Sequence, residues 1–207
     1  MRIKFLLFFL FLSVNIESHS QSKTKQFFKL STPEKCWVIF HPFKVKRAFY
    51  IMQDALKTTD SISKTNLIDD DLNGGQLDAF KHSYWMARST QKIGERASIK
   101  LGKAHEKGNF RSFKEGKRED GFLPDQPSSE MDLYNNNVGV EIAKKYPEHS
   151  KFEMILTVID EVKAGSMKIL KKDCEGNFLT CSGEIIPKES LKGSWENKKC
   201  LVDSSSK

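Results

Sequence analysis

The fold is decided by the stretch NGGQLDAFKHSYWMA, residues 73–87, in which a glycine pair precedes a helical pattern. At about 3.6 residues per turn, Asp78 and His82 share one face of the predicted helix. The opposite face carries Leu77, Phe80 and Tyr84, and this apolar face predicts a contact with the hydrophobic core. The acid and the imidazole one turn apart are either a structural pair or part of a chemical site.

The spacing of apolar residues predicts further helices around this central one, which we expect over residues 75–93. They are expected at residues 44–57, at 95–107, from Ser129 onward, and between Pro147 and Gly165. The predicted fold class is mainly α: a single-domain bundle of about five helices.

The segments between and after these helices are expected to be irregular. Residues 35–42 are expected to be extended or to form one turn, and residues 109–127 a long surface loop that could act as a lid. The C-terminal part is expected to be a small disulfide-linked hairpin or irregular tail, in which residues 167–170 pair with 178–181.

The length of 207 residues is typical of one domain. Residues 1–20 resemble a secretory signal, because Arg2 and Lys4 precede an apolar run and a small-x-small cleavage site. No later stretch approaches the ~20 apolar residues of a membrane-spanning helix. We therefore expect a polar lead-in at residues 21–36, a helical domain at 37–165 and an extension at 166–207, in a secreted or periplasmic protein.

Four cysteines lie outside the central helices, and an even number in an exported chain predicts two disulfides. These residues are Cys36, Cys174, Cys181 and Cys200. One of the three possible pairings joins Cys174 to Cys181 and Cys36 to Cys200. Metal binding by the cysteines is the weaker interpretation, because the chain has no C-x-x-C spacing.

The chain is basic, with a formal net charge of +7. Removal of residues 1–20 takes away two basic residues and one acidic residue, which lowers the charge to +6. A positive charge favours an anionic substrate or surface, but the basic residues alternate with acidic ones, which is typical of a solvated surface.

A second polar pattern occurs in the helix predicted from Ser129 onward, where Asp132, Asn135, Asn136 and Gly139 form one stripe between apolar residues. Asparagine is a poor helix former, and buried amides need hydrogen-bond partners. Gly139 allows a neighbouring helix to approach closely. The stripe therefore predicts either a buried hydrogen-bond network or a ligand site, facing groups on the central helix.

Three motifs together resemble a bacterial family known as a domain of unknown function: DAFKH at 78–82, AHE at 104–106 and MDLYNNNVG at 131–139. The family patterns are D-A-F-[RK]-H, A-H-E and M-D-L-x-N-N-x-x-G. The resemblance covers roughly residues 37–165. It implies an exported, mostly helical bacterial domain and supplies no reaction.

The leading functional hypothesis is a hydrolase that uses a divalent metal ion to activate water. The candidate ligands are His82, His105 and Asp132, with Asp78 expected to orient His82. Glu106 is expected to act as general base.

Asn135 and Asn136 are expected to hold the substrate of this hydrolase. A metal-free acid–base site built from the same groups is a second hypothesis. The third is a non-enzymatic protein, in which the buried polar residues fix the packing of the helices and the long loop binds a partner.

Overall fold

The computed structural model describes residues 29–118 and 121–206, and the expected signal sequence lies outside the described residues. Seven helices and one two-stranded sheet make up the described part, which confirms the predicted mainly α class. The helices are α2 (Thr32–Phe40), α3 (Val45–Ser63), α4 (Gln76–Ile93), α5 (Glu95–Lys114), α6 (Gln126–Lys145), α7 (Lys151–Lys163) and α8 (Lys188–Leu191). The strands are β1 (Lys168–Leu170) and β2 (Leu201–Asp203).

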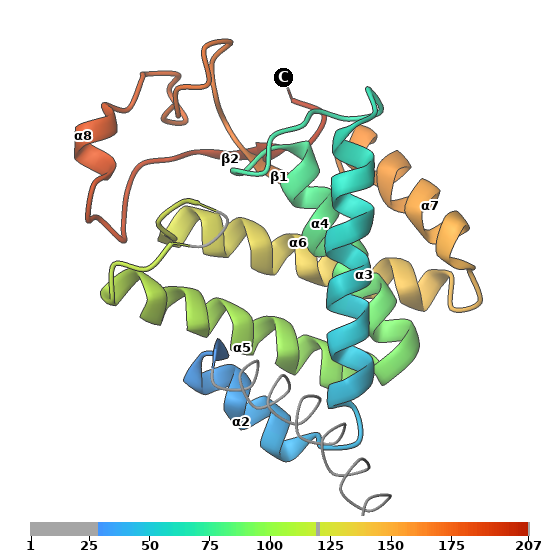
Figure 1. Ribbon diagram of the computed structural model, residues 1–207. Coiled ribbons are helices and arrows are strands. Elements are labelled where there is room, and N and C mark those ends of the chain that lie inside the picture. The colour runs from blue at the N-terminus through green and yellow to red at the C-terminus, as the bar shows by residue number, and fades with distance from the viewer. Residues whose placement is uncertain (1–28, 119–120, 207) are drawn as a thin grey trace, which may run out of the picture.

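Helix α4 is the centre of the bundle and contacts α3, α5, α6 and α7 (Figure 1). Its most extensive contact is with α6, and α2 packs against α5 at the lower end of the molecule. Leu77, Phe80 and Tyr84 of α4 are fully buried in the core. The apolar face predicted from residues 73–87 therefore has the expected role.

The glycine pair before α4 is required by close contacts with two other segments. Gly74 has a φ of +88°, and a Cβ there would lie 2.6 Å from the Leu170 side chain. A Cβ on Gly75 would lie 2.4 Å from that of Asp71. The start of α4 thus fits against β1 and the preceding loop only because both side chains are absent.

Helices α4 and α6 approach each other most closely at Gly139, where a Cβ would lie 2.1 Å from the Ser83 carbonyl oxygen. The Ser83 hydroxyl donates to the Asn135 carbonyl oxygen across the same contact, at 2.9 Å. The close approach expected at Gly139 brings the polar stripe of α6 against α4.

Three predicted helix boundaries are wrong. Helix α3 continues to Ser63, beyond the expected end at residue 57, because Thr58, Thr59 and Ile62 are buried against the core. Helix α5 continues through Gly108 to Lys114. This glycine does not end the helix but makes room for the start of α2, since a Cβ on Gly108 would lie 2.6 Å from Ser31 Oγ. Helix α6 begins at Gln126, with Asp125 as N-cap accepting from the Ser128 N–H at 3.0 Å. The loop between them is therefore much shorter than predicted.

Helix α2 replaces the extended or single-turn segment expected at residues 35–42. A capping box begins this helix, with Ser31 as N-cap and Glu34 as its reciprocal partner. The Trp37 indole donates to the Ala97 carbonyl oxygen at 2.9 Å, so α2 is fixed onto α5 by a buried hydrogen bond.

The C-terminal sheet joins strands that are farther apart in sequence than the predicted hairpin. Strand β1 pairs antiparallel with β2, and the segment of residues 178–181 makes only isolated bridges. Ser204, just after β2, is fully buried, and its hydroxyl donates to the Val162 carbonyl oxygen at 2.7 Å. The chain end therefore closes the core beside α7.

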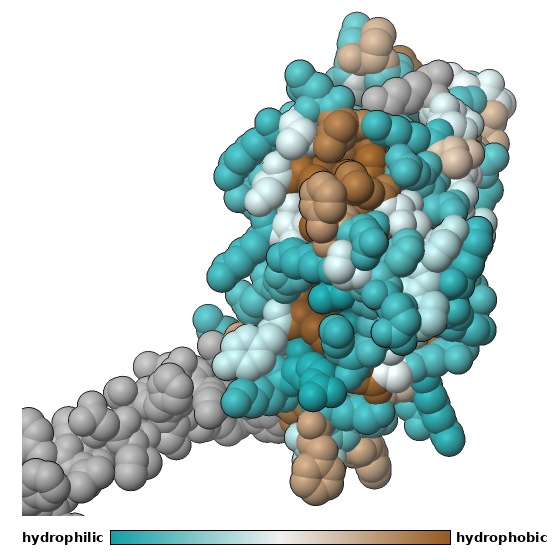
Figure 2. Space-filling model, turned by 90° about the vertical axis from the view of Figure 1, so that its right-hand side faces the viewer, coloured by the Kyte–Doolittle hydropathy of each residue, from teal (hydrophilic) through white to brown (hydrophobic). Residues whose placement is uncertain are grey.

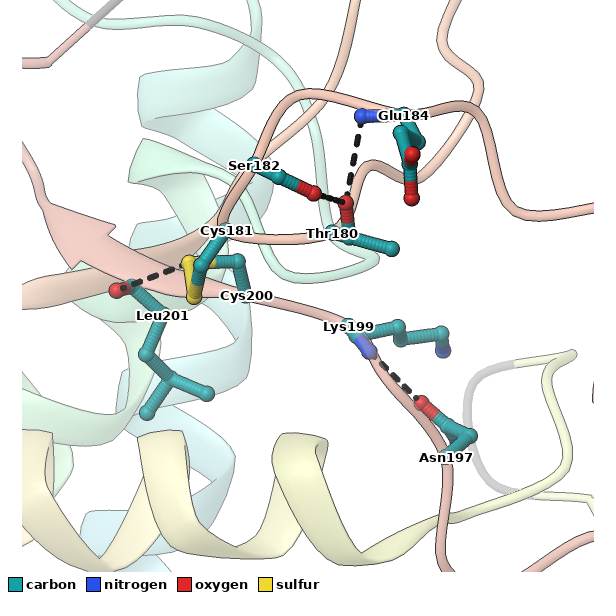
Figure 3. Close-up of a disulfide and its surroundings, with 8 residues drawn as sticks. All are labelled: Thr180, Cys181, Ser182, Glu184, Asn197, Lys199, Cys200 and Leu201. Carbon is teal, nitrogen blue, oxygen red and sulfur yellow. Dashed lines mark hydrogen bonds between the residues drawn. A yellow bond between two sulfur atoms is a disulfide. The ribbon is translucent and has the colours of Figure 1, made fainter.

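The structure contains a disulfide between Cys181 and Cys200, and its pairing differs from the one considered from sequence (Figure 3). Backbone hydrogen bonds place the two segments together, because the Cys200 N–H donates to the Leu179 carbonyl oxygen at 3.0 Å. Cys36 and Cys174 are exposed free thiols, so the expectation of two disulfides is wrong.

Hydrophilic side chains surround a hydrophobic area on the face that Figure 2 shows. Helix α7 lies on this side of the molecule and exposes Phe152 and Leu156. None of the helices within residues 29–118 and 121–206 combines the length and the apolar content needed to cross a bilayer.

Candidate functional site

Asp78, His82 and Asp132 form a buried cluster at the contact between α4 and α6. The His82 Nε2 atom lies 3.3 Å from Asp132 Oδ1 and 3.6 Å from Asp78 Oδ1. Each of the three residues offers one possible metal-ligand atom, and these three atoms lie within 4.8 Å of one another. The arrangement brings together residues more than fifty positions apart in sequence.

The local structure of α4 holds Asp78 in place. Its Oδ2 atom accepts from the Gly74 N–H at 2.9 Å, which joins the carboxylate to the turn before the helix. Its Oδ1 atom also lies 2.9 Å from Lys81 Nζ, one turn later. Asp78 is thus oriented by the backbone on one side and by a cation on the other.

The His82 imidazole is only 4% exposed. Burial lowers the pKa of His82 well below its ordinary value of 6.5, and the charges of Lys81 and His105 act in the same direction. The Asn136 side chain, beside the ring, acts in the opposite direction. His82 is therefore neutral at pH 7, which is the form that binds metal ions.

A small polar cavity of about 40 Å³ adjoins the cluster. Its polar lining includes Lys81, Asn109, Ser128 and Ser129 in addition to the cluster itself. A cavity needs about 10–15 Å³ to hold one water molecule, so this one has room for water next to the carboxylates.

Glu106 lies behind the wall of this polar cavity and does not line it. Its Oε2 atom accepts from Ser129 Oγ at 2.8 Å and from Asn109 Nδ2 at 3.1 Å. Since Ser129 and Asn109 do line the cavity, Glu106 acts by positioning them. The structure does not place it as the direct general base expected from sequence.

His105 is separated from the carboxylates of the cluster. Its Nδ1 atom lies 3.2 Å from Glu34 Oε1, on α2. Its ring centroid is 6.3 Å from that of His82 and 5.4 Å from that of Trp85. The predicted metal ligands were His82, His105 and Asp132. The structure brings together Asp78, His82 and Asp132, so Asp78 replaces His105 in the candidate set.

The two asparagines have different environments. The Asn135 side chain is fully buried and bonds the backbone of Lys168 twice, from Nδ2 to the carbonyl oxygen and from the N–H to Oδ1, both at 2.9 Å. It fixes β1 to α6 and has no free face for a substrate. Asn136 is also buried, beside His82, and its side-chain oxygen and nitrogen make no hydrogen bond to the described residues.

Comparison with known proteins identifies one family. Residues 35–166 match the family described as "Domain of unknown function (DUF6973)". The chain belongs to the DUF6973 family. The match confirms the resemblance to a family of unknown function and includes Asp78, His82 and Asp132. No match was found among curated proteins or among solved structures.

Sequence reasoning missed three polar residues of this DUF6973 domain that surround the cluster. Lys81 has a detectable signal, because it lies three positions after Asp78 on a helix. Asn109 was assigned to a loop, and Ser129 to a helix cap, because both neighbouring helix boundaries were misplaced.

Proposed function

We propose that the protein is a hydrolase that holds a divalent metal ion between Asp78, His82 and Asp132. The observation that carries this proposal is the convergence of two carboxylates on one neutral imidazole nitrogen. Ligand atoms about 2.0–2.1 Å from a tetrahedral zinc ion lie roughly 3.3–3.4 Å from one another. The separations of 3.3 and 3.6 Å from His82 Nε2 are close to this spacing.

The charges of the cluster also support a cation. The lining of the polar cavity includes two carboxylates, those of Asp78 and Asp132, and one ammonium group, that of Lys81. Acidic groups therefore outnumber basic ones around the cavity, and carboxylates together with an imidazole are suitable ligands for a divalent cation.

Three protein ligands leave a coordination position for water, as in catalytic zinc sites. The ion would lower the pKa of this water and thereby supply hydroxide for attack on a carbonyl or phosphoryl centre. The hydroxyls of Ser128 and Ser129 and the Asn109 amide would hold polar atoms of the substrate in the adjoining cavity. Lys81 would stabilise negative charge that develops in the transition state.

The proposal extends to where the protein acts. We place it outside the cytoplasm, on the basis of the signal-like residues 1–20 and the disulfide between Cys181 and Cys200, since disulfides persist in oxidising compartments. An anionic substrate is consistent with the positive net charge.

A second candidate function is non-enzymatic: the cluster would serve only to join α4 to α6. The ion pair between Lys81 and Asp78 and the tight contact at Gly139 favour this alternative. It predicts a protein that binds no metal and loses stability when a cluster residue is replaced.

Metal analysis separates the two candidates. The purified protein is incubated with Zn²⁺ or Mn²⁺, dialysed and analysed for metal by mass spectrometry, alongside Asp132→Asn and the matched control Asp160→Asn on the exposed face of α7. We expect one ion per chain in the wild type and in Asp160→Asn, and none in Asp132→Asn. Equal metal content in both variants would overturn the proposed site.

Activity is tested with chromogenic esters and phosphoesters. Hydrolysis should require the metal-loaded protein, stop on chelation and return when the ion is restored. Activity in Asp132→Asn equal to that of the wild type would exclude this cluster as the catalytic site.

A further inference from the structure

An apolar groove of about 290 Å³ lies next to the polar cavity, on the other side of His82. Helices α2, α3, α4 and α5 all contribute to it. Its apolar lining includes Trp37, Ala48, Met52, Ala55, Trp85 and Leu101. Ligand sites are typically concave and apolar with a small number of polar groups, and this groove has that composition.

The polar groups of the groove gather where it meets the candidate metal site. Lys81 and His82 line both the groove and the polar cavity, so the two spaces share one wall. His105 and Glu34 also line the groove, with His105 Nδ1 3.2 Å from Glu34 Oε1. A molecule in the groove therefore reaches the cluster with one end, while the rest of it contacts hydrocarbon.

Trp85 provides a second observation that points to a ligand. Its side chain lines the groove and is 92% buried, since its exposed fraction is 8%. Its Nε1 atom is buried and donates to no acceptor among the described residues. A buried donor without an acceptor is unusual in a folded protein, and a bound polar group would satisfy it.

We propose that the groove binds the hydrocarbon chain of a fatty-acyl ligand and directs its carboxyl end to Lys81 and His82. The placement of the carboxyl end rests on the proposed function, because the metal ion supplies the positive charge that a carboxylate needs, next to the wall that the groove and the polar cavity share. The hydrocarbon chain of the ligand is bound by the apolar walls of the groove, independently of any metal ion.

The volume of the groove sets the length of the chain. An apolar cavity of about 150 Å³ holds one benzene molecule, so a groove of nearly twice that size accommodates on the order of twelve carbon atoms. Affinity should rise about fourfold for each added methylene group up to that length and then level off.

The test is calorimetric titration of the purified protein with saturated fatty acids of six to fourteen carbons, below their micelle concentrations. The variant Ala55→Leu extends a buried side chain into the groove, and Ala164→Leu, at an exposed position after α7, is the matched control. Ala48→Leu is a second filling variant, and thermal unfolding verifies that each protein is folded.

We expect Ala55→Leu or Ala48→Leu to weaken dodecanoate binding at least tenfold, with hexanoate binding and metal content unchanged. The proposal would be overturned by an affinity that does not depend on the length of the acyl chain. This result is expected if another part of the polypeptide or a second copy of the protein fills the groove. Filling variants that bind dodecanoate as tightly as Ala164→Leu does would also overturn the proposal.

The same experiment distinguishes a failure of the groove from a failure of the metal site. Metal binding without chain-length dependence refutes the groove alone, and chain-length dependence in a protein that binds no metal refutes the metal site alone. Titration with methyl dodecanoate then separates the two sources of an acyl chain. Its hydrolysis by metal-loaded protein indicates an ester substrate, and binding of the free acid alone indicates a fatty acid ligand.

Discussion

Replacement of Gly139 by alanine is expected to separate α4 from α6. The new Cβ would lie 2.1 Å from the Ser83 carbonyl oxygen, which belongs to the backbone of α4 and cannot rotate away. A carbon–oxygen contact needs about 3.3 Å, so the two helices must move apart by roughly 1 Å.

Two opposing effects determine the change in stability. Alanine is favoured over glycine in a helix by about 1 kcal/mol. Overpacking of a rigid core contact costs about 3 kcal/mol at the upper end of its usual range. The overpacking is larger, and the net loss in the free energy of unfolding is roughly 2 kcal/mol, or about 4–8 °C in Tm for a domain of this size.

The same movement would widen the candidate metal site, because His82 belongs to α4 and Asp132 to α6. Metal affinity should fall at least about tenfold, as is typical when the support of a ligand is disturbed. Urea unfolding and metal titration measure the two effects.

The matched control is Gly102→Ala on α5, where the new Cβ would lie 3.2 Å from the Asn136 amide nitrogen and 3.4 Å from the Met86 methyl carbon. These are ends of side chains, which can shift, so this variant should remain within about 1 kcal/mol of the wild type. A Gly139→Ala protein as stable as Gly102→Ala, with wild-type metal affinity, would refute the reasoning.

Three further predictions concern residues outside the proposed metal ligands. Asn135→Ala should lower the free energy of unfolding by about 2 kcal/mol in urea titrations, because both backbone polar groups of the half-buried Lys168 lose their partners, and it should leave metal content unchanged. Replacement of both Cys181 and Cys200 by serine should cost about 3 kcal/mol, since the disulfide closes a loop of 19 positions, whereas Cys36→Ser should have no such effect on urea unfolding. Burial alone would raise the pKa of Glu34, but the hydrogen bond and charge of the neighbouring imidazole hold that pKa below its ordinary value of 4.5. The stabilisation by Glu34 is therefore fully present above pH 4.5 and is lost as the pH falls through the lowered pKa. In the Glu34→Gln variant the free energy of unfolding should therefore fall less steeply in acid. Urea unfolding at several pH values between 7 and 3 measures this difference.

The sequence predicted the bundle and its central helix because these follow from local periodicity. The apolar face of residues 73–87 and the small residue at Gly139 both have the roles expected of them. The wrong helix end at Gly108 has a tertiary cause, since this glycine makes room for the Ser31 side chain, and no local pattern reveals that contact. The disulfide pairing likewise depends on a backbone hydrogen bond, from Cys200 to Leu179, between segments that are distant in sequence.

The candidate site was predicted in part. Asp78, His82 and Asp132 do meet, as the polar stripes of two helices indicated. Adjacent residues on a helix point about 100° apart, so His105 and Glu106 could not both face the cluster. The structure resolves this conflict by directing His105 toward α2 and Glu106 toward Ser129.

The buried charges favour a ligand over packing alone as the reason for the cluster. If Asp132 served only to join α6 to α4, a neutral side chain of similar size would serve as well, because burial of a carboxylate has a desolvation cost even where it is paired. The cavity beside the cluster is lined by the carboxylates of Asp78 and Asp132 and by the ammonium group of Lys81. Acidic groups therefore outnumber basic ones around a cavity that can hold water. A packing network gains nothing from this excess of acidic groups, whereas a cation site uses it, so metal content is the measurement on which the two functional alternatives differ most.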